Sequence, residues 1–261
     1  MGGEAERRLA LVTGGGIGIG KALVGALARA GCDIAFCHLD PDPEAEAAAT
    51  EALAASEGAT CHGIRADVGD PAGAEAIFAM VDARFGRPAE ILVNNAGTQV
   101  WSSLLDHEDA DWDRVIRVNL SGAFYMTARF ARRLVAAGKG GTVVNIGSGC
   151  NKLAFPSLVS YTASKGGVEQ FTKAAALELG PRGITVNCVA PGAIATERTA
   201  AEAADYGAAW GALTPMRRVG TPEDVAEAVV WLASPAARFV SGQTLGVDGG
   251  LFSQAVWASE R

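Results

Sequence analysis

Short runs of apolar residues alternate along this chain with longer stretches in which apolar residues return every three or four positions. A short unbroken apolar run is typical of a buried strand, whereas three-to-four spacing is typical of a helix that covers a sheet. The runs predict strands at about 9–12, 34–37, 60–65, 91–94, 142–146, 184–189 and 243–247. The spaced stretches predict helices at about 21–30, 43–57, 71–85, 109–137 and 222–233, and a further helix that begins near Tyr161.

This alternation of strands and helices predicts an α/β fold: a Rossmann-like, doubly wound parallel sheet of about seven strands with helices on both faces. The sequence shows no internal repeat, low-complexity linker or break in composition, so residues 1–261 are predicted to form a single domain. The one long connection, 195–216, holds small residues together with Tyr206 and Trp210. Connections of that length are often functional, and we expect this one to be a lobe that covers a substrate.

Charge and composition narrow the classes of function. The net charge of −7 gives no sign of a nucleic-acid-binding surface, and the basic cluster Arg129, Arg132 and Arg133 fits the solvated face of one predicted helix. No apolar stretch approaches the roughly 18 residues of a membrane-spanning helix. The first residues lack the apolar core of a signal peptide, which favours a cytoplasmic protein. The five cysteines stand singly and the three histidines show no paired spacing, so neither a disulfide framework nor a metal site is predicted.

A glycine-rich loop follows the first predicted strand and precedes the first predicted helix. Gly14, Gly18 and Gly20 form the pattern T-G-x-x-x-G-x-G over 13–20. Glycine allows the backbone to turn tightly and a diphosphate to approach, and the helix that follows offers unpaired N–H groups to that anion. A plain turn would explain an isolated glycine run, but the strand–loop–helix setting favours a dinucleotide site.

The choice between NAD and NADP depends on the end of the second strand. An acidic residue there would bind the ribose hydroxyls, and a basic residue would accept a 2′-phosphate. The position falls at about His38, followed by Leu39 and Asp40, and neither Lys nor Arg occupies 15–17. The sequence therefore leans slightly to NAD, while His38 is compatible with either cofactor.

Tyr161 and Lys165 stand four residues apart at the start of a predicted helix. Side chains at this spacing share one helix face. A free phenol has a pKa of about 10, and a neighbouring cation lowers it towards the range useful for acid–base catalysis. An isolated Tyr–Lys pair is usually part of an ordinary helix surface, so a catalytic role for it depends on motifs elsewhere in the chain.

The chain resembles the short-chain dehydrogenase/reductase family, in its branch of about 250 residues, along nearly its whole length. The ordered motifs that carry the resemblance are T-G-G-G-I-G-I-G (13–20), Asp67-Val68, Asn94-Asn-Ala-Gly97, Asn119, Ser148, Tyr161-x-x-x-Lys165, Pro191-Gly192 and Val247-Asp-Gly-Gly250. Ser148 precedes Tyr161 by the separation usual in the family. So many motifs in the right order make a chance match very improbable.

The resemblance implies roles for individual residues. It implies the catalytic residues Asn119, Ser148, Tyr161 and Lys165. It implies that the cofactor contacts Gly14, Gly18, Ile19, Gly20, His38, Asp67, Val68, Asn95, Ala96, Gly97, Tyr161, Lys165, Pro191, Gly192, Ile194 and Thr196. Several of these follow predicted strand ends, where ligands of open α/β sheets bind.

The implied reaction is hydride transfer between the nicotinamide of NAD or NADP and the carbinol or carbonyl carbon of a small alcohol or ketone. The predicted substrate pocket consists of Gln99, Trp101, Ser148, Cys150, Asn151, Phe155, Tyr161, Ile194 and Trp210. This mixture suits a sugar, a polyol, a cyclic ketone or an acyl β-ketone, and the sequence does not choose among them. Lys152 could meet an anionic group, although a surface position explains it more simply.

Three alternatives remain at this stage. A sensor that binds the dinucleotide without catalysis would usually lack the Tyr–Lys pair, and a nucleotide-sugar epimerase would have different glycine spacing and a larger C-terminal region. A 3-oxoacyl carrier-protein reductase would carry a basic residue before the glutamate of the Tyr helix, where Leu177 precedes Glu178. The resemblance also implies a homotetramer, or a homodimer, built through the Tyr161 helix and the C-terminal strand.

Overall fold

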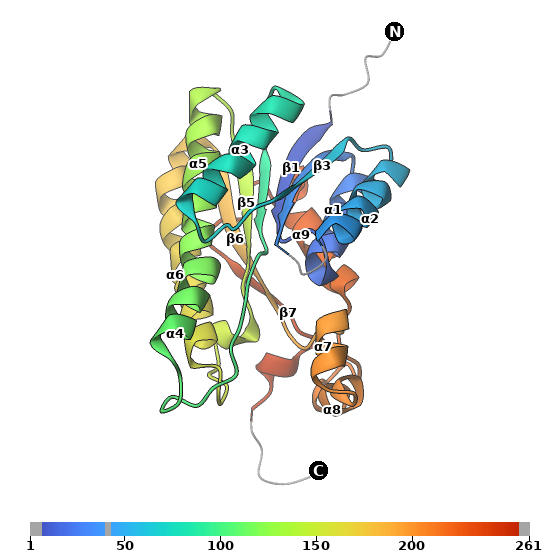
Figure 1. Ribbon diagram of the computed structural model, residues 1–261, viewed down its shortest axis with the longest axis vertical. Helices are drawn as coiled ribbons and strands as arrows, with labels where there is room; N and C mark the ends of the chain where they lie inside the picture. The colour runs from blue at the N-terminus through green and yellow to red at the C-terminus, as the bar shows by residue number, and fades with distance from the viewer. Residues whose placement is uncertain (1–6, 40–42, 256–261) are drawn as a thin grey trace.

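The computed structural model describes residues 7–39 and 43–255, which form a seven-stranded parallel sheet between two layers of helices (Figure 1). The fold class predicted from the sequence is confirmed. The strands are β1 (Arg8–Thr13), β2 (Cys32–His38), β3 (Cys61–Arg65), β4 (Ile91–Asn94), β5 (Gly141–Ile146), β6 (Ile184–Pro191) and β7 (Thr244–Val247). Their order in the sheet is β3-β2-β1-β4-β5-β6-β7.

Helices cover both faces of the sheet, as Figure 1 shows. One layer contains α1 (Gly18–Arg29), α2 (Pro43–Ser56) and α9 (Pro222–Ala233), and the other contains α3 (Pro71–Phe85), α4 (Asp109–Ile116), α5 (Gly122–Ala136) and α6 (Val159–Leu179). Strand residues alternate between the two layers: Ala10 and Val12 pack in the first core, and Leu9 and Leu11 in the second. Burial on both faces explains why the strands read as unbroken apolar runs.

The prediction of one long helix over 109–137 is wrong in one respect. It is interrupted by a π-helical segment, Arg117–Ser121, which separates α4 from α5. A π-helical turn inserts an extra residue and is often found at functional sites. Here it turns Asn119 inward, where the side chain holds both backbone groups of Thr98.

The connection 195–216 also differs from the irregular stretch that the sequence indicates. It contains two short helices, α7 (Glu197–Glu202) and α8 (Tyr206–Leu213), at the lower end of the molecule in Figure 1. A capping box begins α7, since Thr196 and Thr199 exchange hydrogen bonds between side chains and backbone. Such a box satisfies N–H groups that a short helix would otherwise leave unpaired.

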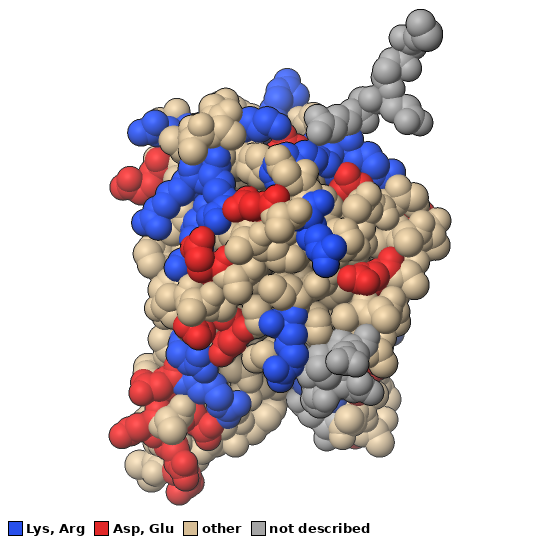
Figure 2. All heavy atoms as spheres, turned by 45° about the horizontal axis from the view of Figure 1, so that its top comes forward, with Lys and Arg blue, Asp and Glu red and all other residues tan. Residues whose placement is uncertain are grey.

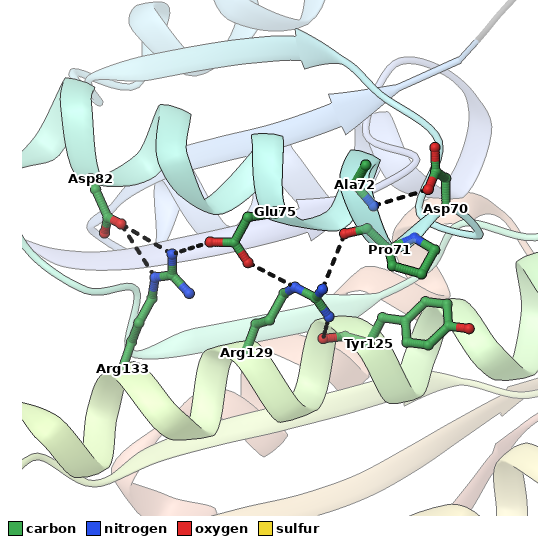
Figure 3. Close-up of polar contacts among 8 residues, drawn as sticks. All are labelled: Asp70, Pro71, Ala72, Glu75, Asp82, Tyr125, Arg129 and Arg133. Atoms are coloured by element: carbon green, nitrogen blue, oxygen red, sulfur yellow. Dashed lines mark hydrogen bonds and ion pairs between the residues drawn. The ribbon is translucent and has the colours of Figure 1, made fainter.

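The basic cluster on α5 forms a bridge to α3 rather than a purely solvated face. Figure 3 shows Arg133 between Glu75 and Asp82, while Arg129 binds Glu75 and the carbonyl of Pro71. The Arg133 guanidinium also lies 4.6 Å from the ring centroid of Phe78. On the face shown in Figure 2, basic and acidic side chains intermix over the helices.

The helices and potential metal ligands of residues 7–39 and 43–255 bear on the predicted classes of function. None of the helices in these ranges has the length and apolar character needed to cross a membrane. No group of three or more His, Cys, Asp or Glu side chains in the same ranges is arranged to hold a metal ion.

Candidate active site

The strand order reverses between β1 and β4, and the glycine loop lies at this switch point. Gly14 and Gly18 have φ angles of +65° and +52°, in the left-handed region that favours glycine. A Cβ atom on Gly20 would stand 1.8 Å from the carbonyl oxygen of Gly14, so a side chain has no room there. The loop runs directly into α1, whose N-cap residue Ile17 makes no side-chain hydrogen bond to the first N–H groups. This backbone cradle fits a dinucleotide diphosphate.

The loop after β4 is tied to the glycine loop. The Asn95 amide donates to the carbonyls of Thr13 and Gly14 at 3.0 Å each, and the Thr13 hydroxyl accepts the backbone N–H of Ala96 at 3.0 Å. These bonds fix the carboxyl ends of β1 and β4 side by side, as a binding crevice at a switch point requires.

A cavity of about 310 Å³ opens beside these loops. Predicted cofactor contacts from four segments line it, and we call them the adenosine-side residues: Gly14, His38, Asp67, Val68, Ala96 and Gly97. Two cations that the sequence reading missed, Arg114 and Arg117, line it as well. Arg117 pairs with Asp67 at 2.9 Å, and Arg114 pairs with Asp111.

The first turns of α6 bring Tyr161 and Lys165 to the carboxyl end of β5. Lys165 is 4% exposed, and its Nζ donates to the carbonyl of Ile146 at 2.7 Å and lies 5.6 Å from the centroid of the Tyr161 ring. Asn145 holds α6 in place because its amide donates to the Thr172 hydroxyl at 2.9 Å. These contacts from β5 thus fix the position of both side chains in the site.

Ser148 begins the short 3₁₀ turn that follows β5. Its hydroxyl accepts the N–H of Cys150, and Ser148 lines the same cavity as Tyr161. Asn151 holds the backbone of Ser148, since its Oδ1 accepts the Ser148 N–H at 3.0 Å. The sequence placed Asn151 in the substrate pocket, and the structure corrects this: its amide is directed to Ser148 and to the Cys188 sulfur.

Burial dominates the electrostatics of this pair. It raises the pKa of Tyr161 to about 12, and the neighbouring Ser148 side chain and the charge of Arg198 offset part of the rise. Burial also lowers the pKa of Lys165 to about 8. The lowered Tyr161 pKa expected from the sequence is therefore not found, because burial of the phenol outweighs the neighbours that lower its pKa.

Asn119 lies behind this pair in the π-helical segment. Its amide donates to the Thr98 carbonyl at 2.9 Å and to the Ser164 hydroxyl at 3.0 Å. Ser164 in turn donates to the carbonyl of Tyr161 at 2.7 Å. A cavity of about 10 Å³ lies between Asn119 and Lys165, about the volume that one water molecule needs.

A larger cavity of about 590 Å³ opens in front of Ser148 and Tyr161. Six further residues of the predicted substrate pocket line it: Gln99, Trp101, Cys150, Phe155, Ile194 and Trp210. The same cavity is lined by the predicted cofactor contacts Ile19, Pro191, Gly192, Ile194 and Thr196, which we call the nicotinamide-side residues. Both sets therefore face one space.

Comparisons with known proteins agree with this geometry. A family model described as enoyl-(acyl carrier protein) reductase matches residues 15–252. The (3R)-3-hydroxyacyl-CoA dehydrogenase of Mus musculus is 38% identical, over 94% of this chain and 96% of its own length. The galactitol 2-dehydrogenase (L-tagatose-forming) of Cereibacter sphaeroides is 41% identical, over 92% and 93%. The chain belongs to the short-chain dehydrogenase/reductase family.

A solved relative adds the cofactor. A structure from Agrobacterium tumefaciens with bound NADP matches this short-chain dehydrogenase with a TM-score of 0.85 and 36% identity, covering 96% of this chain and 98% of its own. The protein is thus an NAD(P)-dependent oxidoreductase that transfers a hydride between the nicotinamide and the carbinol or carbonyl carbon of an alcohol or ketone.

Sequence reasoning missed part of the wall of the large cavity in this short-chain dehydrogenase. Arg198 and Tyr206 line it from α7 and α8, and Phe252 lines it from the C-terminal segment. Phe252 stacks edge to face on Phe155 at a centroid distance of 5.8 Å. The aromatic residues at 206 and 210 were a visible signal, but nothing local in the sequence points Arg198 or Phe252 inward.

Proposed function

We propose that Ser148, Tyr161 and Lys165 carry the reaction at the rear wall of the large cavity. The single observation that supports this proposal is that Ser148 and Tyr161 line one cavity, with the Lys165 ammonium 5.6 Å from the tyrosine ring. Both hydroxyls line a cavity that also holds the predicted nicotinamide-side residues. A substrate oxygen can therefore meet two hydroxyls while its carbon faces the cofactor.

The proton and hydride steps balance without further reagents. A dinucleotide held by the glycine loop would supply the hydride acceptor for alcohol oxidation and the hydride donor for ketone reduction. Tyr161 takes the hydroxyl proton as the carbonyl forms, and returns a proton to the oxygen in the reverse direction. Ser148 donates a hydrogen bond to the substrate oxygen and stabilises the charge that develops there.

Lys165 and Asn119 assist this proton transfer without reacting with the substrate themselves. The charge of Lys165 favours the deprotonated form of Tyr161 during the transfer. We propose that a water molecule in the cavity of about 10 Å³ links Lys165 to Asn119 and passes protons onward. Asn119 acts here mainly as a positioning residue, because its amide is already bound to Thr98 and Ser164.

A Tyr161→Phe variant tests this assignment. The phenyl ring keeps the packing but cannot exchange a proton, so we expect a loss of about 10²–10⁴ in turnover with unchanged dinucleotide affinity. Turnover of alcohols and ketones with NAD(H) and NADP(H) is followed through the absorbance of the reduced cofactor. Tyr206→Phe is the matched control, since Tyr206 lines the same cavity from α8.

Two outcomes would contradict the proposal. Wild-type turnover in Tyr161→Phe would remove Tyr161 as the acid–base group. Tight dinucleotide binding without turnover of any alcohol or ketone by the wild-type protein would favour the sensor, which belongs to a different class of function.

We propose NAD as the preferred cofactor. The glycine-loop positions 15–17 carry no cation, and the described end of β2 offers His38 rather than Lys or Arg. Arg114 and Arg117 do reach the adenosine-side cavity, but Asp111 and Asp67 offset their charges. This arrangement supports a ribose with free hydroxyls over one with a 2′-phosphate.

We also propose that the protein is a homotetramer, with a homodimer as the alternative. The support lies in the family resemblance and in exposed apolar side chains on α6 and near β7, among them Leu177, Phe239 and Leu245. β7 forms one edge of the sheet. An edge strand with exposed apolar side chains is commonly covered by a partner.

A further inference from the structure

The large cavity has a single formally charged side chain in its described lining. Its wall is mainly apolar and aromatic, and Arg198 is the one formally charged side chain among the described residues that line it. No Asp or Glu in this part of the chain reaches the same wall. Arg198 therefore supplies the only formal charge among these lining residues.

Arg198 lines the same cavity as Ser148 and Tyr161. It stands in the first turn of α7, two residues after Thr196, whose hydroxyl accepts the N–H of Thr199 and fixes the backbone. The positive charge of Arg198 lowers the pKa of Tyr161 and that of Lys165. The guanidinium thus acts on the same space in which the substrate hydroxyl must sit.

An anionic group could in principle reach Arg198 from the substrate or from the diphosphate of the dinucleotide. The two sources approach different parts of this segment. Gly18 of the diphosphate loop faces Thr196 and the Glu197 carboxylate, which would lie 3.7 and 4.0 Å from a Cβ at position 18. Arg198 instead lines the cavity that holds Ser148 and Tyr161. This placement favours the substrate as the source.

We propose that Arg198 binds a carboxylate on the substrate, so that the protein acts on hydroxy acids and the corresponding keto acids. This inference rests on the function proposed above and names its substrate class. Arginine binds carboxylates through two parallel N–H···O bonds and stays charged at every working pH. A neutral alcohol of the same shape lacks that interaction.

Ligand binding can be measured independently of turnover, because Trp101 and Trp210 line the cavity. Tryptophan fluorescence is titrated with 3-hydroxybutyrate and its methyl ester, and with gluconate and the neutral polyol glucitol. Within at least one pair we expect the acid to bind about 10- to 100-fold tighter than its neutral counterpart. In Arg198→Met this difference should disappear, and Arg198→Lys should restore part of it.

A matched control separates the site from net charge. Arg132→Met removes the same charge from an exposed position near the carboxyl end of α5 that does not line the cavity, and should leave the preference for acids unchanged. The same variants are assayed for kcat/KM on both members of each pair. Arg198→Met should lower kcat/KM for the acid and change that for the neutral alcohol less than about threefold.

Three results would overturn the inference. Equal affinity of the wild-type protein for acids and neutral counterparts would remove the carboxylate site. Equal losses on both members of a pair in Arg198→Met would make Arg198 a structural residue. A tenfold or larger loss of NADH affinity in that variant, with the acid preference intact, would assign Arg198 to the diphosphate. A protein that prefers to bind acids but turns over no alcohol would contradict the proposed function and leave the carboxylate site standing.

Discussion

At the scale of single residues, the position of the Ser148 hydroxyl depends on a neighbour that does not touch the substrate cavity. Asn151 receives the Ser148 N–H on its side chain and donates its own N–H to the Ser148 carbonyl at 2.9 Å. A Cβ at Gly147 would stand 2.8 Å from the Asn151 amide, so the turn is closely packed on both sides. Asn151 is therefore a positioning residue for Ser148.

Replacing Asn151 should affect turnover more than binding. Asn151→Ala removes the acceptor for the Ser148 N–H, and we expect kcat to fall about 10- to 100-fold because small displacements of a reacting group are costly. KM and the affinity for NADH should change less than about threefold. Asn151→Asp keeps an acceptor oxygen and should recover part of kcat.

Lys152→Ala serves as the control for the Asn151 variants, because Lys152 is the adjacent exposed residue. It should retain wild-type kcat. A parallel loss of kcat, NADH affinity and thermal stability in Asn151→Ala would indicate general disruption of the turn, and the positioning role would be rejected.

Functional side chains can be predicted from the sequence where they belong to a fixed spacing. They cannot be predicted where their position depends on tertiary folding. Tyr161 and Lys165 share a helix face, and Ser148 follows a recognisable strand, so their convergence could be predicted. Arg198 enters the cavity only because Thr196 starts a helix there. The high pKa of Tyr161 also escaped prediction, since desolvation depends on how completely the assembled walls exclude water.

At the scale of elements, the break between α4 and α5 could not be foreseen. The apolar spacing over 109–137 continues through both helices, and nothing in it marks the π-helical turn at Arg117–Ser121. The turn is stabilised by contacts from elsewhere: Asn119 is anchored to Thr98 and to Ser164 on α6. The helix pattern thus predicts the element but not the irregularity that positions a functional residue.

The ion network between α3 and α5 gives a pH-dependent contribution to stability. Hydrogen bonds from Arg133 and Arg129 lower the pKa of Glu75 in the folded state. A carboxyl with a lowered folded pKa stabilises the protein above its unfolded pKa, about 4.3, and loses this effect as pH falls through the folded value. We expect Glu75→Gln to lower the free energy of unfolding by less than about 1 kcal/mol at pH 7, since the pair is largely exposed.

Urea unfolding of wild type and Glu75→Gln at several pH values measures this contribution. The difference between them should become smaller as the pH falls from 7 to 3, and it should shrink in 1 M NaCl because salt screens exposed charges. Glu178→Gln removes the same charge from an exposed position on α6 and should show no such dependence. A difference for Glu75→Gln that is unchanged between pH 7 and pH 3 would mean that the ion pairs do not produce it.

At the scale of the whole molecule, the sheet could be predicted almost completely. A strand buried on both faces leaves an unbroken apolar run, and each predicted run overlaps one of β1–β7. Glycine and alanine at helix surfaces then allow close packing on the sheet. What the pattern leaves open is the outer surface, since an exposed apolar side chain looks the same in the sequence whether it faces water or another subunit.

The exposed edge at β7 supplies a test of the proposed assembly. Leu245 on β7 is 37% exposed, and the nearby Phe239 is fully exposed. If a second copy covers this edge, light scattering after size exclusion should give a mass of four times 26.7 kDa for the wild-type protein. Leu245→Asp places a charge in the buried contact and should reduce the mass to that of a dimer or monomer at micromolar concentration.

The matched control for this surface is Ala55→Asp, which adds the same charge on the exposed side of α2, in the layer at the other edge of the sheet. Its mass should equal that of the wild type. A monomeric wild-type protein would contradict the proposed homotetramer, and an unchanged mass in Leu245→Asp would move the contact away from β7. The active site lies at the carboxyl end of the neighbouring strand β6, which ends at Pro191. A partner at this edge would therefore also stabilise the wall against which the nicotinamide is proposed to lie.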